Sequence, residues 1–128
     1  MNIFGIVELN QLKEHEEINK ERLEELKQGI KLDGILKDPI IVDKNTKIIL
    51  DGHHRFNSIK QLGYKKILVY FVDYTSPKIR VLSRRKSKVT KEDVIQAGLS
   101  GKKMLERTSK HLIPNRPRNI CVSLEKFK

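Results

Sequence analysis

The chain has few of the sequence features that crosslink small proteins or anchor them in membranes. It contains one cysteine, Cys121, so an internal disulfide framework is excluded and a reducing, cytoplasmic setting is expected. Because Cys121 lies between Ile120 and Val122, we expect it to be a small buried hydrophobe. The N-terminus lacks the basic and long apolar regions of a signal peptide, and no apolar run is long enough to span a bilayer, so no membrane association is predicted.

Acidic residues are scarce relative to basic ones. The 16 Asp and Glu residues against 27 Lys and Arg give a net charge of +11, which suits anionic partners such as nucleotides, phosphates or nucleic acid. A lysine-rich, solvated surface explains the excess equally well, and the abundance of Lys, Glu and Ile would also suit a heat-stable protein. With 38% apolar residues, we expect a single domain at residues 1–128 with one modest core. The sequence leaves the oligomeric state open.

Hydrophobic patterning predicts an α/β chain of the α+β type. Asn19 can cap a helix in which Leu23, Leu26 and Ile30 recur at helical spacing, and Gly34 would end it. The other predicted segments are strands at residues 3–9, 40–42, 47–50, 67–72, 79–82 and 120–124, helices at residues 56–62 and 90–98, a mobile basic loop at residues 83–88 and a polar connector stiffened by two prolines at residues 108–117.

The turn between the strand at 47–50 and the following helix carries the densest chemistry. It reads Asp51-Gly52-His53-His54-Arg55, which matches neither the dinucleotide fingerprint nor the Walker pattern. Backbone N–H groups at the helix start, both imidazoles and the guanidinium could converge on a di- or triphosphate that Gly52 allows to approach. Asp51 could hold a magnesium ion or take a proton. The alternative, that Asp51 caps the helix and the histidines are incidental surface residues, explains only one residue of the motif.

Two other segments carry side chains that suit a phosphate site. His15-Glu16-Glu17 is a charged surface loop or, alternatively, supplies Glu16 as a general base for a hydroxyl nucleophile. Thr108-Ser109-Lys110-His111 could bind phosphate oxygens from a second side, or could be only a polar connector. The spacing of the histidines and the single cysteine gives no zinc motif.

The order of these segments resembles the ParB/sulfiredoxin superfamily, whose fold is a small mixed sheet flanked by helices. Within it the chain most resembles the free L-serine kinases of archaea, which convert L-serine to O-phospho-L-serine. Three blocks carry the resemblance, at residues 12–16, 51–55 and 108–114. The family's last block usually reads Thr-Thr-Arg-His, and here Lys110 replaces the arginine, which keeps the charge but loses the bidentate fork.

The resemblance implies a role for each block. Glu16 would activate the serine hydroxyl as the base, and Asp51 would assist it or hold Mg²⁺. The donor would be ATP or ADP. The residues expected to bind nucleotide phosphates are Gly52, His53, His54, Arg55, Thr108, Ser109, Lys110 and His111, with His54 and Arg55 also placing the substrate. The alternative is a ParB-like DNA-binding or partition-type protein without catalytic activity, which the positive charge also suits.

Overall fold

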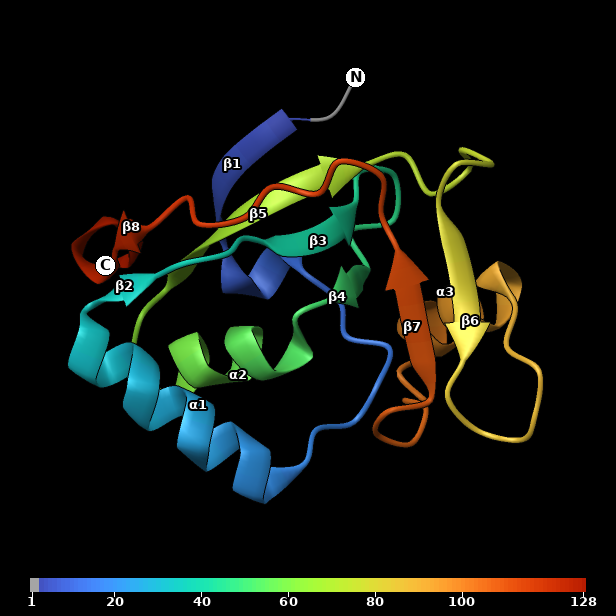
Figure 1. Ribbon diagram of the computed structural model, residues 1–128, viewed down its shortest axis with the longest axis horizontal. Helices are drawn as coiled ribbons and strands as arrows, with labels where there is room; N and C mark the ends of the chain where they lie inside the picture. The colour runs from blue at the N-terminus through green and yellow to red at the C-terminus, as the bar shows by residue number, and fades with distance from the viewer. Residues whose placement is uncertain (1–2) are drawn as a thin grey trace.

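A four-stranded mixed sheet lies at the centre of the computed structural model, which describes residues 3–128 (Figure 1). Its strand order is β1-β5-β3-β4, with β3 and β5 parallel and both outer strands antiparallel to their neighbours. The strands are β1 (Ile3–Glu8), β3 (Ile40–Asp43), β4 (Ile49–Asp51) and β5 (Lys66–Val72). The predicted mixed α/β architecture is therefore confirmed.

Two helices, α1 (Lys20–Asp33) and α2 (His53–Gln61), lie side by side on one face of this sheet (Figure 1). The start of α1 is the predicted one, because the Asn19 side chain accepts a hydrogen bond from the N–H of Arg22 at 2.9 Å. Gly34 ends α1 in the left-handed conformation, with φ 69°. Leu23 and Ile30 are buried, so the predicted apolar stripe faces the core.

The remaining elements form two small antiparallel pairs and their connections. One pair contains the strand β7 (Ser109–Leu112), which lies in the segment that was predicted to be a polar connector. Ser109 and His111 are buried and Lys110 is exposed, and this alternation is typical of a strand. These elements are the 3-10 helices η1 (Leu9–Gln11) and η2 (Leu124–Phe127), the strand pairs β2 (Ile35–Leu36) with β8 (Val122–Ser123) and β6 (Arg80–Ser83) with β7 (Ser109–Leu112), and α3 (Lys91–Ser100). Among residues 3–128, no helix has both the length and the apolar character that crossing a membrane requires.

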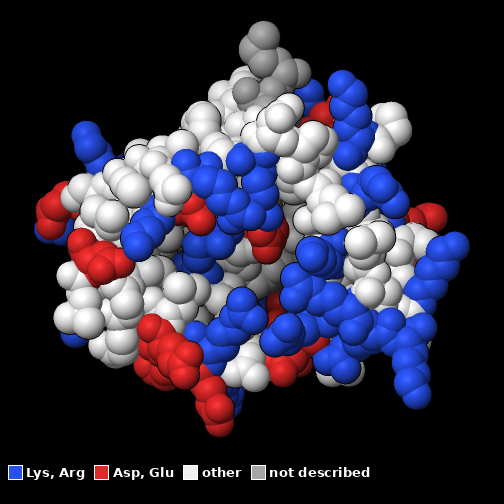
Figure 2. All heavy atoms as spheres, viewed as in Figure 1, with Lys and Arg blue, Asp and Glu red and all other residues white. Residues whose placement is uncertain are grey.

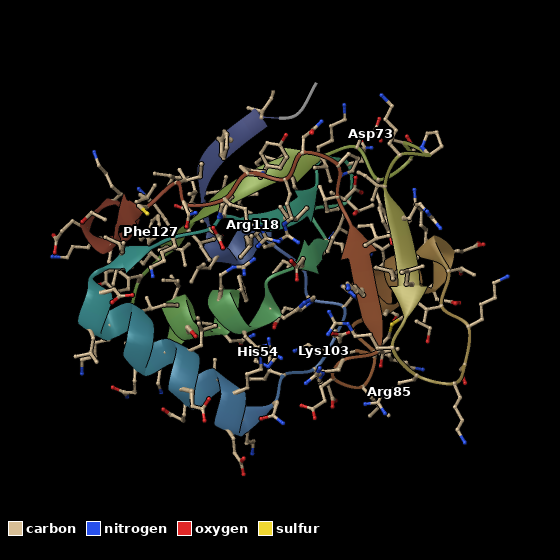
Figure 3. The ribbon with its side chains drawn as sticks, in the orientation of Figure 1. His54, Asp73, Arg85, Lys103, Arg118 and Phe127 are labelled. Atoms are coloured by element: carbon tan, nitrogen blue, oxygen red, sulfur yellow. The ribbon has the colours of Figure 1, made fainter. Side chains whose placement is uncertain are left out.

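The buried apolar residues form two clusters, where the sequence predicted one core. Strand β3 contributes to both, since Ile40 and Val42 belong to the cluster beneath α1 and α2 while Ile41 belongs to the other. Phe127 completes the first cluster (Figure 3), and Val94 of α3 is part of the second. The sheet is thus covered on both faces, and its central strands are continuous apolar runs for that reason.

The expectation for Cys121 was wrong. This residue is exposed and has a left-handed backbone with φ 57°. Its N–H donates to the Lys37 carbonyl at 3.0 Å, as does that of Ile120 at 2.8 Å. The chain follows an irregular path here, and the predicted strand is reduced to Val122–Ser123, so apolar neighbours did not make Cys121 part of a core.

The predicted basic loop at residues 83–88 is a loop, and hydrogen bonds hold it in place. The Arg85 guanidinium donates to the carbonyl of Glu106 at 2.6 Å and to the hydroxyl of Thr108 at 3.1 Å. Ser83 donates through its hydroxyl to the Arg85 carbonyl at 2.8 Å. The loop is therefore attached to the chain just before β7.

Helix α3 begins as predicted but does not end at Gly98. Thr90 and Asp93 form a reciprocal capping box, and the helix continues to Ser100 before Gly101 ends it. Gly98 instead lies against the sheet, where an added Cβ would be 2.6 Å from Cδ1 of Ile48. Its missing side chain is what lets α3 approach the second cluster closely.

We predict that Gly98→Ala destabilises the protein although alanine favours helix. The new methyl group has no space beside the buried Ile48 side chain, and such overpacking costs about 1–3 kcal/mol. The matched control is Gly29→Ala in α1, where nothing lies within 4 Å of the added Cβ, and it should stabilise by about 0.5–1 kcal/mol. Urea unfolding of both variants measures this. Equal free energies of unfolding for the two would contradict the close-packing role of Gly98.

Candidate active site

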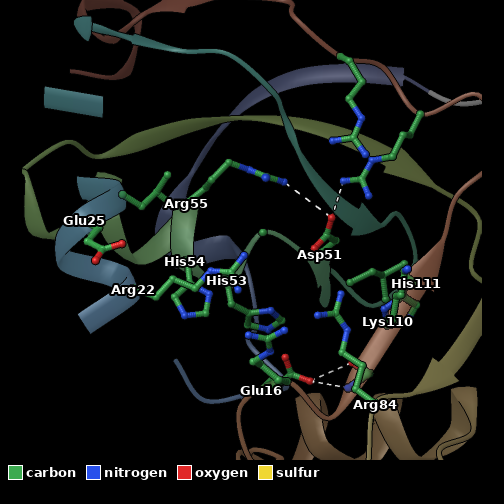
Figure 4. A pocket seen from close by; sticks show the side chains of 17 residues that line it. Glu16, Arg22, Glu25, Asp51, His53, His54, Arg55, Arg84, Lys110 and His111 are labelled. Atoms are coloured by element: carbon green, nitrogen blue, oxygen red, sulfur yellow. Dashed lines mark hydrogen bonds and ion pairs between the residues drawn. The ribbon is translucent and has the colours of Figure 1, made fainter. Parts of the chain in front are cut away.

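A pocket of about 650 Å³ opens where α1, the start of α2 and β7 meet (Figure 4). It brings together the three segments that the sequence singled out. The predicted residues that line it are Glu16, Asp51, Gly52, His53, His54, Arg55, Ser109, Lys110 and His111. Thr108 does not line the pocket, but its backbone N–H donates to Glu16 at 3.1 Å.

The turn from β4 into α2 requires glycine. Gly52 has φ 106°, and an added Cβ would lie 2.5 Å from Cγ2 of Ile40 on the neighbouring strand. No side chain among residues 3–128 caps α2, so Asp51 is not a helix cap. The N–H of Phe56 bonds to the Gly52 carbonyl at 2.9 Å, and the three N–H groups before it have no acceptor within the helix. The positive end of α2 thus faces the pocket.

Asp51 is paired with two arginines. Its Oδ2 accepts a hydrogen bond from Arg116 and lies 3.9 Å from Nη2 of Arg55 (Figure 4). Burial raises the pKa of Asp51, but the charges of Arg55 and Arg116 outweigh this effect and hold the pKa below its ordinary value. Asp51 is therefore a carboxylate at neutral pH.

Glu16 is fixed by the segment at the start of β7. Its Oε1 accepts from the backbone N–H groups of Thr108 at 3.1 Å and Ser109 at 2.8 Å, and from the Ser109 hydroxyl at 3.0 Å. These bonds join segments more than 90 residues apart in the chain and hold the carboxylate at the pocket wall. The Ser109 hydroxyl, predicted to bind phosphate, already has protein partners here.

The histidines are not incidental surface residues. His53 is 5% exposed and accepts a hydrogen bond through Nε2 from the N–H of His15 at 3.1 Å. His111 is 6% exposed, and its Nε2 shares a hydrogen bond with the Tyr74 hydroxyl at 2.8 Å. Burial lowers the pKa of His111 to about 3 and that of His53 well below its ordinary value. Both rings are neutral at pH 7, so they serve the site as hydrogen-bonding groups and not as cations.

His54 ties α2 to the start of α1. Its Nε2 accepts the N–H of Asn19 at 3.0 Å, so Nε2 of this ring is also unprotonated. Partial burial lowers the pKa of His54, and the charge of Arg22 lowers it further.

Several arginines that line the pocket were not predicted as site residues, because the sequence shows the excess of positive charge but not where it lies in the fold. Figure 2 shows Lys and Arg side chains gathered around a hollow on this face. The additional basic residues that line the pocket are Arg22, Arg84, Arg107, Arg116 and Arg118. Their basic character was the one signal in the sequence, since they come from four separate places: α1, the 83–88 loop, the segment between α3 and β7, and the C-terminal segment.

Three buried side-chain nitrogen atoms in residues 3–128 have no hydrogen-bond partner. They are Nε of Arg55, Nε of Arg116 and Nδ1 of His111, and all three belong to residues that line the pocket. Because buried polar groups are nearly always paired in folded proteins, their concentration here indicates a site that a polar ligand completes.

We predict that acid weakens the fold through the buried histidines. The folded pKa of His111 is about 3, against about 6.5 when unfolded, so its contribution is present above about pH 6.5 and is lost as pH falls. Each histidine kept neutral should lower the free energy of unfolding by about 1.4 kcal/mol per pH unit below that value. His111→Gln should reduce the slope by this amount when urea unfolding is measured between about pH 6 and 4.5. An unchanged slope would show that His111 is protonated in the folded protein.

Comparisons with known proteins show which family the chain belongs to. A model of the ParB N-terminal domain matches residues 4–86. The ATP-dependent L-serine kinase of Staphylothermus marinus is 34% identical over 80 residues, which are 59% of this chain and 32% of that protein. The ADP-dependent L-serine kinase of Thermococcus kodakarensis is 30% identical over 82 residues, or 61% of this chain and 34% of that protein. The chain spans about a third of the length of these curated relatives.

Solved structures extend the likeness to the whole fold. A free serine kinase in complex with AMP superimposes with a TM-score of 0.91 at 17% identity, covering 98% of this chain and 93% of the other. This match and that of the ParB N-terminal domain together confirm the predicted ParB-like α/β fold. Since the domain match runs from β1 past the end of β6, the chain belongs to the ParB N-terminal domain family.

Proposed function

We propose that this chain is a phosphotransferase that moves a phosphoryl group from ATP or ADP to the hydroxyl of free L-serine, giving O-phospho-L-serine. The observation that carries the proposal is the convergence of the three resembling segments on one pocket whose buried nitrogens lack partners. Similar proteins named as L-serine kinases, one ATP-dependent and one ADP-dependent, support the choice of reaction.

The pocket suits the phosphate groups of an adenine nucleotide. The uncapped N-terminus of α2 offers backbone N–H donors to an anion, as phosphate-binding helices do. On the opposite wall, Arg84, Arg107 and Lys110 supply positive charge from β7 and the loops beside it. An arginine can bind two phosphate oxygens at once, so the two arginines can orient the transferred phosphoryl group as well as attract it.

In this proposal Glu16 would receive the proton of the serine hydroxyl. Three donors hold its Oε1 against the chain, and Oε2 has no hydrogen-bond partner among residues 3–128. A carboxylate fixed in this way can orient the hydroxyl toward the terminal phosphate and accept its proton as the new O–P bond forms. Positioning of the reacting groups, together with electrostatic stabilisation, provides most of the catalysis in phosphoryl transfer.

Asp51 could hold a magnesium ion together with the phosphates of a bound nucleotide. Its Oδ2 is paired with Arg55 and Arg116, whereas Oδ1 has no partner in the described chain. No group of three or more His, Cys, Asp or Glu side chains in residues 3–128 could hold a metal ion. Mg²⁺ is commonly held by one or two carboxylates together with substrate phosphates, so the single oxygen suffices. The ion would neutralise charge on those phosphates, and its removal with EDTA should abolish activity.

The direct test is formation of O-phosphoserine from L-serine, Mg²⁺ and either ATP or ADP. We predict that the wild-type protein forms it with at least one donor and that Glu16→Gln lowers kcat by about 100-fold or more, because the amide cannot accept the proton. Glu24→Gln, a surface carboxyl on α1, is the matched control and should retain wild-type kcat. Absence of product with both donors would refute the function, and a fully active Glu16→Gln would refute the base.

The DNA-binding alternative rests on the family match and on the basic residues around the pocket. Affinity for duplex DNA that falls steeply with salt would support it. We expect at most weak binding that ATP or ADP displaces, because the basic residues surround a pocket of about 650 Å³, which is the size of a small-molecule site.

A further inference from the structure

A buried histidine lies directly behind Glu16, joined to it by one hydroxyl group. Oγ of Ser109 is 3.0 Å from Oε1 of Glu16 and 3.0 Å from Nε2 of His15. The His15 ring is 0% exposed and does not line the pocket, so it cannot touch a substrate. Ser109 is the group through which the His15 ring reaches Glu16 by hydrogen bonds.

Counting protons shows that Ser109 has two acceptors for one hydrogen. Nδ1 of His15 lies 2.7 Å from the Ile49 carbonyl, which can only accept, so Nδ1 carries the ring proton. Burial lowers the pKa of His15, and the neutral ring then presents an electron pair at Nε2. The Glu16 carboxylate also only accepts. The Ser109 hydroxyl can donate to Glu16 or to His15 but not to both at once.

The groups around this unit do not supply the missing hydrogen. The rings of His53 and His111 face His15 at centroid distances of 4.6 and 5.8 Å, and both are neutral. The negative charges near His15 are Glu16 and Asp51, and neither donates a hydrogen. The two backbone donors to Glu16, from Thr108 and Ser109, do not depend on His15.

We propose that His15 sets the basicity of Glu16 by competing with it for the Ser109 hydroxyl. When Ser109 donates to Glu16, the hydrogen bond stabilises the carboxylate and weakens it as a base. When Ser109 donates to His15, Glu16 loses that bond and accepts a proton more readily. The proposal deepens the proposed kinase function, since the proton concerned is that of the serine hydroxyl. His15 and Ser109 are positioning residues, because neither needs to contact the substrate.

The two partners should therefore have opposite effects on Glu16. Ser109→Ala removes a donor to the carboxylate, so the midpoint of the acid limb of the kcat–pH profile should rise by about one pH unit. His15→Phe leaves Glu16 as the only acceptor for Ser109, so the midpoint should fall by about as much. His15→Asn serves as a second variant in case phenylalanine does not fold, since its amide can still donate toward the Ile49 carbonyl. Ser109→Thr keeps the hydroxyl and should restore the wild-type midpoint.

A second measurement separates this proposal from the kinase assignment. The carboxyl ¹³C shift of labelled Glu16, followed against pH, reports the same midpoints without any catalytic turnover. Opposite displacements in the two variants support the competition whether or not phosphoserine forms. Displacements in the same direction, or none in either variant, would overturn it even in an active kinase. A protein that makes no phosphoserine but shows the opposite displacements would refute only the reaction.

Discussion

Two consecutive imidazoles at the start of α2 hold the loop on which Glu16 lies. His53 accepts the backbone N–H of His15, and His54 accepts that of Asn19, so the loop is attached on both sides of Glu16. Asn19 is also the cap of α1, which means that the same contact sets where this helix begins. The position of Glu16 and the packing of α1 on α2 thus depend on the same pair of hydrogen bonds.

These bonds require neutral imidazole rings, so the histidines that accept them cannot supply the positive charge of the site. A protonated imidazole has no electron pair to accept an N–H, and a buried acceptor that loses its partner costs about 1–3 kcal/mol. Burial keeps His53 in the neutral form. The histidines therefore build the wall of the pocket, while the positive charge that an anionic ligand needs comes from arginines, Lys110 and the end of α2.

Much of the frame could be predicted from local signals in the sequence. The cap at Asn19, the glycine turn at Gly52 and the capping box at Thr90 depend on residues a few positions away, and all three occur. The strand β7 was missed because its burial alternates over only four residues beside a proline-containing segment. Gly98 was wrongly predicted to end its helix. A glycine can end a helix or allow close packing of a neighbouring element, and only the contact with Ile48 shows that the second role applies.

The parts of the site that could not be predicted depend on long-range contacts. Arg116 reaches Asp51 from a position 65 residues later in the chain, along a segment in which Asn115 and Asn119 both adopt left-handed conformations. The N–H of Asn119 donates to the carboxylate of Asp38 at 2.8 Å, and this contact fixes the segment beside the residues that lead into β3. Local sequence patterns do not predict the course of this segment, because its asparagines and arginines indicate neither a strand nor a helix. The guanidinium that holds Asp51 is thus positioned by backbone turns at Asn115 and Asn119, so changes in those turns would alter the site although neither asparagine lines the pocket.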